Sequence, residues 1–273
     1  MPLDSESKLT QRQALAIYAP RTYRKPSISN AAAGVMMALW RSAGMPTQGA
    51  IPVGAATPTA ATLGAAEIAA AQPEELMHLS LLQATMPVAG TLLMFDRLAH
   101  MGGLSGIVAS PTAQTVNLDL ATAAGQGRCA LNGSDVEWYL EWYTDTGATG
   151  VTVTASYTNQ DNVGGRTTQA ISLPATRRAS MCYAFLPQAG DMAIRSIQTV
   201  TLSATTGTAG NFGVTARKRL GAVGVATNHF SEREDCFSLG FPSTRDTACL
   251  EFLIHPTGTT TGDVHGQYQM ISG

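Results

Sequence analysis

The chain has 273 residues, with 17 Lys and Arg against 19 Asp and Glu and a formal net charge of −2 at pH 7. Charged residues make up 13% of it, which is well below the roughly 25% of average globular chains. This composition excludes a global basic field for nucleic acid or membrane, and it favours a surface that packs against copies or partners.

The first 66 residues predict an arm that leads into an extended segment. Residues 1–30 are interrupted by prolines and contain a short helix-like run, TQRQALAIYA. Residues 45–66 are rich in Pro, Ala and Gly, which predicts a linker or a long loop. The arm is either a frayed terminus or a segment that lies on a neighbouring subunit or an acidic surface. Its basic residues, which are candidate interface residues, are Arg12, Arg21, Arg24 and Lys25.

Two alternating runs predict a β-hairpin between residues 136 and 158. In VEWYLEWY (136–143) apolar and polar side chains alternate with a period of two, as in a half-buried strand. TDTGATG (144–150) consists of turn-forming residues, and residues 151–158 alternate again. The two runs are therefore expected to pair with each other.

The two faces of the first run have different expected roles. Trp138 and Trp142 share the apolar face, which predicts that they belong to the core. Tyr139 and Tyr143 lie on the opposite face and are candidate interface residues, or a platform for sugar rings. The two glutamates of that second face are expected to be solvent or interface charges.

Short alternating runs continue through residues 107–220 at spacings of about 10–20 residues, separated by Gly-rich turns. They predict a mainly β protein: a β-sandwich or jelly-roll-like domain with an extended N-terminal arm. The sandwich domain is placed at residues 67–220, after the arm and extended region at 1–66. Residues 221–273 are predicted to be a C-terminal extension that packs on the sandwich or on a neighbour.

The sequence lacks the usual patterns of catalytic and metal sites. HExxH, GxSxG and phosphate-loop motifs do not occur, and the five histidines show no HxH spacing. Asp96 and His100 are four residues apart, for which we expect a structural role. The cluster Arg217–Arg219 predicts a solvated strand end or a salt-bridge set, or else a contact with acidic neighbours. We therefore expect no enzyme activity, no bound metal and no cofactor.

The four cysteines leave two alternatives open. None of them forms a CxxC pair, so a zinc site has little support. They are either buried thiols or partners in disulfides that form, within or between chains, after release into an oxidising medium. The disulfide candidates are Cys129, Cys182, Cys236 and Cys249.

The N-terminus, MPLDSESKLT, lacks the basic-then-apolar pattern of a signal peptide. No apolar run approaches the roughly 20 residues of a membrane span. We expect a protein made in the cytoplasm that does not cross a membrane.

Five segments of the chain form distinctive phrases. They are LWRSAGMPTQGAIP (39–52), AGTLLMFDRLAHMGGLSGIV (89–108), AQTVNLDL (113–120), LEWYTDTGATGVTVTASYTNQ (140–160) and RSIQTVTLSATTGTAGNFGVTARKRL (195–220). They resemble a group of tailed-bacteriophage virion proteins, which have similar DRLxHxGGLSG, LEWYTxTGATxVTxTxSYTNQ and SVTLSATTGTAGNFGVT phrases. The resemblance covers roughly residues 39–220.

This resemblance implies a structural component of a virion, without catalytic residues. A head decoration or cement protein is the first expectation, a neck, collar or tail-associated protein the second, and a carbohydrate- or receptor-binding module at a fibre the third. The expected partners are copies of the chain itself, in a trimer, and the major capsid protein or neck proteins. No specific nucleic acid is expected.

Overall fold

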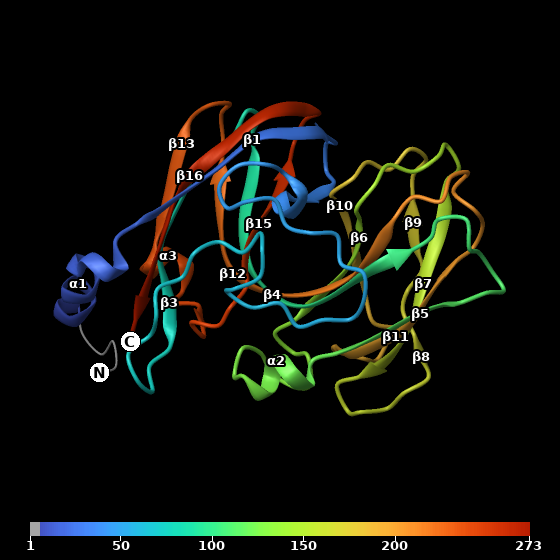
Figure 1. Cartoon of the computed structure of the whole chain (residues 1–273), viewed down its shortest axis with the longest axis horizontal. Coiled ribbons are helices and arrows are strands. Elements are labelled where there is room, and N and C mark those ends of the chain that lie inside the picture. Colours follow the sequence, from blue (N-terminus) through green and yellow to red (C-terminus); the bar gives the residue numbers. More distant parts are fainter. Residues whose placement is uncertain (1–5) are drawn as a thin grey trace.

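The protein folds into packed layers of antiparallel β-structure (Figure 1). The computed structural model describes residues 6–273, apart from the side chains of residues 27–30 and 260. A closed barrel lies in the middle, with one five-stranded sheet on each side of it. The predicted mainly β fold of sandwiched antiparallel sheets is confirmed, and its middle layer is a barrel.

Strands from all parts of the chain close the central barrel. In their order of pairing they are β10 (Met181–Phe185), β2 (Met36–Ala38), β15 (Leu250–Pro256), β4 (Gly90–Leu104), β12 (Phe212–Val225) and β6 (Glu137–Trp142). β6 pairs in turn with β10, which completes the ring. β4 and β12 pair along most of their length and cross from one outer sheet toward the other.

The two outer sheets cover the barrel on opposite sides. The first outer sheet consists of β1 (Arg21–Ala31), β16 (Thr260–Ser272), β3 (Met77–Thr85) and β13 (Ser231–Asp235), with β14 (Ser243–Thr244) paired to β3. The second outer sheet consists of β5 (Gln114–Asp119), β11 (Ile194–Leu202), β7 (Val151–Asn159) and β8 (Arg166–Thr167), with β9 (Ile171–Leu173) paired to β7. β1 and β13 are therefore the two edges of the first outer sheet.

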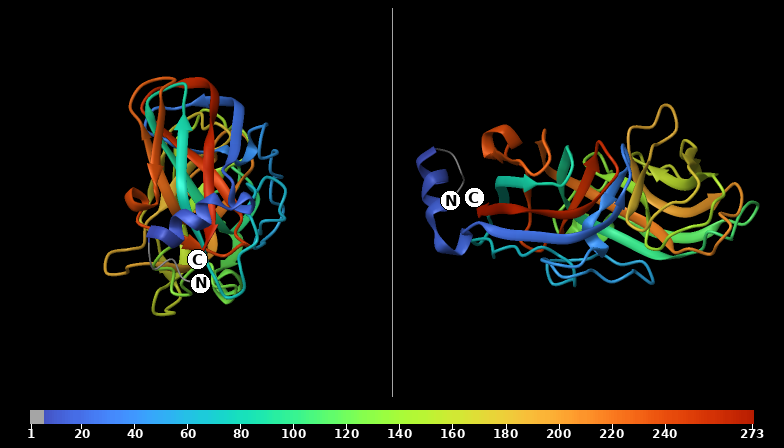
Figure 2. Two further views of the ribbon diagram at one scale, coloured as in Figure 1. Left: turned by 90° about the vertical axis from the view of Figure 1, so that its left-hand side faces the viewer. Right: turned by 90° about the horizontal axis from the view of Figure 1, so that it is seen from above.

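The helices are short and peripheral. They are α1 (Glu6–Ala14), α2 (Ala121–Gly125) and α3 (Cys236–Leu239), with single 3-10 turns η1 (Ala16–Tyr18) and η2 (Leu39–Arg41). α1 and the C-terminus lie at the same end of the elongated molecule (Figure 2). Among residues 6–273, no helix has the length and apolar character needed to span a membrane.

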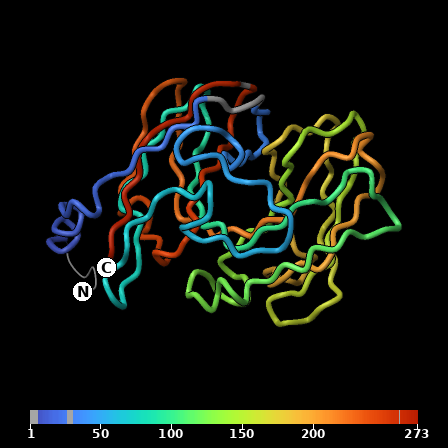
Figure 3. Tube along the Cα trace, viewed as in Figure 1, coloured from blue at the N-terminus to red at the C-terminus, as the bar shows by residue number. Residues whose placement is uncertain are grey.

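Residues 45–66, which we call the strap, run across the barrel without regular secondary structure (Figure 3). Ala56 exchanges backbone hydrogen bonds with His100, and the Ala66 amide donates to Leu250 O over 2.8 Å. A side chain at Gly102 would collide with the carbonyl of Pro52. Small residues in the strap and beneath it thus allow the two backbones to approach closely.

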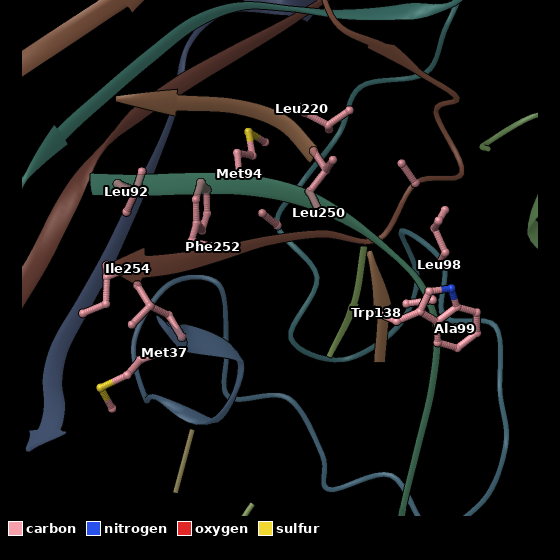
Figure 4. Packing of buried hydrophobic residues seen from close by; sticks show 14 of the residues in the cluster. Met37, Leu92, Met94, Leu98, Ala99, Trp138, Leu220, Leu250, Phe252 and Ile254 are labelled. Carbon is pink, nitrogen blue, oxygen red and sulfur yellow. The ribbon is translucent and has the colours of Figure 1, made fainter. Parts of the chain in front are cut away.

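The apolar core fills the space between the barrel and its flanking sheets. Figure 4 shows the β4 side chains Leu92 and Met94 beside Phe252 of β15. Tyr23 of β1 stacks on Phe252 with ring centroids 4.3 Å apart. This contact joins the first outer sheet to the outer surface of the barrel.

On the other side of the barrel, the tryptophans of β6 face the second outer sheet. Trp138 is 2% exposed and donates through Nε1 to Ile194 O over 2.8 Å. Trp142 is fully buried and packs against Phe212 with ring centroids 4.7 Å apart. The prediction that both tryptophans belong to the core is confirmed.

The predicted hairpin between residues 136 and 158 is wrong in its pairing, although both strands exist. β6 pairs with β10 and β12 inside the barrel, whereas β7 pairs with β11, β8 and β9 in the second outer sheet. The loop between them carries the chain from one layer to the next. A short Gly-containing loop is compatible with either route, and the local pattern does not distinguish them.

The predicted arm is seen only in part. From Arg21 to Ala31 the chain is strand β1, which pairs antiparallel with β16 and belongs to the first outer sheet. At the other end of the chain, β15 closes the barrel and β16 lies between β1 and β3. The predicted boundary at residue 220 lies inside β12.

Replacing Trp142 with Ala is expected to lower the free energy of unfolding by about 3–5 kcal/mol, because it removes a fully buried indole and leaves a cavity. Urea denaturation followed by circular dichroism measures this loss. Val53, whose side chain is 94% exposed, gives the control: Val53→Ala should change stability by less than about 0.5 kcal/mol. A loss below about 1 kcal/mol for Trp142→Ala would contradict the packing described above.

Candidate functional site: the charge network inside the barrel

Four charged side chains meet in the interior of the barrel. They are Arg97 of β4, Glu141 of β6, Arg217 of β12 and Glu251 of β15, and none is more than 1% exposed. Around them an interior apolar cluster draws residues from the same barrel, including Leu93, Tyr139 and Leu253. The two positive and two negative charges balance, as buried charges require.

Each arginine of this network contacts both glutamates. Arg97 Nη1 lies 3.0 Å from Glu141 Oε2 and 3.0 Å from Glu251 Oε2. Arg217 donates from Nη2 to Glu141 Oε2 over 2.7 Å and from Nε to Glu251 Oε1 over 2.6 Å. One charge cluster therefore ties four barrel strands together.

Neutral groups complete the surroundings of the network. Thr215 Oγ1 donates to Glu141 Oε2 over 2.8 Å, and Arg97 Nη2 donates to Tyr143 Oη over 3.1 Å. The Arg97 guanidinium also lies 4.6 Å from the centroid of the Trp40 ring, a cation–π distance. Within residues 6–273, the network atoms without a protein hydrogen-bond partner are Glu141 Oε1 and Arg217 Nη1.

The network keeps its charges in the folded protein. Burial alone raises the pKa of Glu141, but the adjacent Arg97 and Arg217 outweigh burial and lower this pKa below its ordinary value. Burial disfavours the charged form of Arg97, yet Glu141 and Glu251 together hold its pKa above its ordinary value. The carboxylates and guanidiniums thus stabilise each other's ionised forms.

His100 of β4 is a neutral neighbour of this network. Its Nδ1 accepts a hydrogen bond from Arg97 Nε over 2.9 Å, which requires that this nitrogen carry no proton. Burial, reinforced by the charge of Arg97, lowers the pKa of His100 to about 3. Asp96 and His100 are four residues apart in the sequence, but the side chain that hydrogen-bonds to His100 is Arg97.

Asp96 belongs to a second buried cluster, which fastens the strap to the barrel. Arg128 binds both carboxylate oxygens of Asp96 and donates from Nη1 to Pro58 O over 2.7 Å. Thr244 Oγ1 donates to Asp96 Oδ2 over 2.9 Å. One bidentate ion pair therefore connects β4, the segment after α2 and the strap.

These clusters direct their charges toward one another and not toward an external ligand. No group of three or more His, Cys, Asp or Glu side chains suited to a metal ion occurs in the part of the chain that the structure describes. The arrangement is therefore suited to holding strands and loops in place.

The structure removes Tyr139 and Tyr143 from the candidate interface. Each is 3% exposed, because closure of the barrel buries the second face of β6 as well as the first. Glu141, which was expected to be a solvent or interface charge, is buried for the same reason. The predicted platform for sugar rings is therefore wrong.

The basic candidates of the arm differ in accessibility. Arg24 is the most exposed and pairs with Asp263 over 2.8 Å, while Arg21 pairs with Glu67 over 3.1 Å. Arg12 pairs with Glu75 over 2.7 Å and is largely covered.

Lys25 is buried and donates through Nζ to the carbonyls of Ser42 and Pro46, over 3.0 and 2.7 Å. Its burial lowers its pKa to about 8. Of the predicted set, Arg21 and Arg24 are thus the residues best placed to contact another molecule.

The cysteines are free thiols, and no two of them are joined. Cys182 and Cys249 lie in the interior cluster of the barrel, where burial raises the pKa of both. Cys236 is buried as well, whereas Cys129 is partly exposed. The structure therefore contains no disulfide within the chain, and Cys129 is the cysteine best placed for one between chains.

Sequence reasoning missed Arg97, Arg128 and Glu251. The available signal was a charge inside an otherwise apolar strand, as in LLMFDRLA (92–99) and CLEFLI (249–254). Such charges are expensive to bury alone, so their presence within two apolar runs indicates oppositely charged partners. For Arg217, the predicted cluster Arg217–Arg219 is a salt-bridge set: Lys218 pairs with Asp135 and Arg219 with Glu137.

Comparison with known proteins identifies no family. No protein-family model and no curated protein matches the chain. Among solved structures, the VP2 subviral particle of infectious bursal disease virus is similar with a TM-score of 0.21 and 10% identity, over 93% of this chain and 80% of that one. The infectious bursal virus-derived T=1 particle has a TM-score of 0.20 and 11% identity, over 94% and 79%. Similarities of this size carry no inference about fold or function.

Replacing Glu141 with Gln should destabilise the protein by about 3–5 kcal/mol, because it leaves two buried guanidiniums facing a single carboxylate. Chemical denaturation at pH 7 measures the effect. Glu137→Gln is the matched control on the same strand: Glu137 pairs with Arg219, both partners are partly exposed, and its loss should cost less than about 1 kcal/mol. Equal effects of the two substitutions would contradict the role assigned to the network.

Acid is expected to weaken the fold through His100. The unfolded chain binds a proton at this histidine below about pH 6.5, whereas the folded chain does so only near pH 3. Stability from this group is therefore complete above pH 6.5, and it falls by about 1.4 kcal/mol for each pH unit between these values. Denaturation of wild type and His100→Gln at pH 7 and 4.5 checks this.

The His100→Gln variant should lose less stability than wild type over this interval, because glutamine can accept from Arg97 without titrating. The exposed His255 provides the control, and His255→Gln should retain the wild-type pH dependence. An unchanged pH dependence in His100→Gln would show that this histidine does not contribute.

Proposed function

We propose that the chain is a structural component of a tailed-bacteriophage virion, and specifically a head decoration or cement protein. In this role, copies of the chain associate, in a trimer, and grip the major capsid protein. The protein stabilises the capsid through its contacts with other subunits and has no catalytic activity. It finishes in the virion after synthesis in the host cytoplasm.

The observation that carries this proposal is the position of the phrases that resemble phage virion proteins. The segments 89–108, 140–160 and 195–220 are far apart in sequence but are neighbours in the fold: β12 pairs with both β4 and β6, and β11 pairs with β7. The segment 39–52 joins them through Trp40, which packs on Arg97. Phrases that resembled the group by chance would have no reason to assemble into one connected unit.

The energetics of the interior support a role based on rigidity. The two buried ion clusters fix four barrel strands and the strap with charge-assisted hydrogen bonds. A protein that reinforces a particle must resist local opening, and such clusters oppose it. The carbohydrate-binding alternative loses its main support because Tyr139 and Tyr143 are buried.

Purified particles that contain and lack the chain provide the test. Heads without it should burst at lower temperature or lower salt, and adding back the purified chain should restore their resistance. Quantitative mass spectrometry of the particle should give a copy number comparable to that of the major capsid protein. A copy number near that of a portal ring, with unchanged head stability, would overturn the decoration role and favour a neck protein. Absence from purified particles would overturn a virion role altogether.

A further inference from the structure

The carboxylate of Glu141 uses its two oxygens very unequally. Oε2 accepts from Thr215 Oγ1 over 2.8 Å and from Arg217 Nη2 over 2.7 Å, and it lies 3.0 Å from Arg97 Nη1. Oε1 is buried and has no protein donor within the described residues. An ionised carboxylate oxygen can only accept hydrogen bonds, so Oε1 requires a donor that the surrounding side chains do not supply.

The guanidinium of Arg217 has the complementary deficiency. Its Nε donates to Glu251 Oε1 over 2.6 Å, and its Nη2 donates to Glu141 Oε2 over 2.7 Å. Nη1 is buried, and no acceptor among residues 6–273 binds it. The Tyr139 ring lies against the guanidinium, with its centroid 5.2 Å from Cζ. A contact with a ring is weaker than a hydrogen bond to oxygen, so Nη1 requires an acceptor.

The two unpartnered atoms belong to one ion pair that has no access to solvent. The side chains of Arg217 and Glu141 are both 0% exposed, and the bond between Nη2 and Oε2 joins them. A buried charged group that lacks a hydrogen bond suffers the desolvation penalty without compensation. In native proteins, ordered internal water satisfies buried polar atoms of this kind.

The charges of the pair decide which ligand fits between these atoms. A cation would suit Glu141 Oε1 but would be repelled by the guanidinium, and an anion would suit Arg217 Nη1 but would be repelled by the carboxylate. The ligand must therefore be neutral and small, and it must accept one hydrogen bond and donate another. Water has these properties.

Solvent comes close to the ion pair where β2 begins. A pocket of about 250 Å³ opens there, and Met36, Tyr139 and Cys182 form part of its wall. Tyr139 is the residue whose ring lies against Arg217, and Cys182 is directly opposite Glu141 in the pairing of β10 with β6. Side chains of directly opposite residues share one face of a sheet. Residues that adjoin the ion pair therefore also line a pocket that water can enter.

We propose that the barrel holds a structural water molecule between Arg217 and Glu141, which accepts a hydrogen bond from Arg217 Nη1 and donates one to Glu141 Oε1. This bridge runs beside the direct bond between Nη2 and Oε2, so the pair is joined twice. It supplies the donor that Oε1 lacks and the acceptor that Nη1 lacks. The proposal concerns the interior of the barrel and does not depend on the proposed function.

A crystal structure of the full chain, at a resolution that shows ordered water, tests the bridge without any substitution. Electron density for one water is expected within about 3.2 Å of both Arg217 Nη1 and Glu141 Oε1. Several results would overturn the proposal: no density at this position, an ion in its place, a water that reaches only one of the two atoms, or a direct bond from either atom to another protein group.

Magnetic relaxation dispersion of the water oxygen gives a second readout in solution, because it counts internal water molecules with long residence times. The double variant Glu141→Leu/Arg217→Met removes both unpartnered atoms and should contain one long-lived water fewer than wild type. Glu137→Leu/Arg219→Met is the matched control, since it makes the same changes in a partly exposed ion pair of the same two strands. The control should retain the wild-type count.

An unchanged count in a folded Glu141→Leu/Arg217→Met variant would contradict the bridge. Circular dichroism establishes whether this variant is folded. If it is not, the wild-type crystal structure decides alone. Neither readout involves the virion, so this proposal and the proposed function can fail separately.

Discussion

The fold depends on the mutual neutralisation of two arginines and two glutamates inside a closed barrel. Arg97, Arg217, Glu141 and Glu251 come from four different strands and have no access to water. Unpaired, any one of them would be strongly destabilising in this interior. The strands can therefore pack only in the register that brings all four charges together. The network determines which strands pair and in which register more than it adds net stability, since burying an ion pair also costs desolvation free energy.

The small number of charged residues also determines how charge is divided between the interior and the surface. A chain with few charged residues places several of them in internal clusters, including the Asp96–Arg128 pair that holds Pro58 of the strap. The strap needs such anchors because it has no regular hydrogen-bond ladder of its own. Outside these clusters, charge is dense on β13, where four of five residues are charged, and it is otherwise scattered over loops such as those with Glu67, Asp145 and Asp161.

Period-two alternation was sufficient to predict the mainly β class and strands such as β6, β7 and β11, and it placed Trp138 and Trp142 correctly in the core. It did not predict β1, β13 or β16, which lie in the segments taken for an arm and a C-terminal extension. Alternation did not predict whether a strand is buried on one face or on both. Alternation shows that the two faces of β6 differ, but not that a second layer covers the face with Tyr139 and Glu141. Barrel closure depends on residues such as Glu251 that belong to the same charge network as Glu141 of β6 but lie far from it in the sequence. A local sequence pattern therefore cannot reveal them.

The pairing of strands that are far apart in the sequence could not be predicted either. The loop after β6 has the composition of a hairpin turn, yet it connects two layers. The four cysteines illustrate a similar limit, because their spacing does not reveal that Cys182 and Cys249 lie inside the barrel. In contrast, charges within LLMFDRLA and CLEFLI were visible, and their cost of burial indicates that partners must exist.

A double-mutant cycle between Glu141 and Arg217 tests the central claim most directly. The measured quantity is the free energy of unfolding of Glu141→Leu, Arg217→Met and the double variant, relative to wild type. If the barrel depends on charge balance, each single substitution is severe and the double variant is less destabilised than the sum by at least about 1–3 kcal/mol, since it removes one charge of each sign. Additive losses, within about 0.5 kcal/mol, would show that the two groups act independently and would contradict the account.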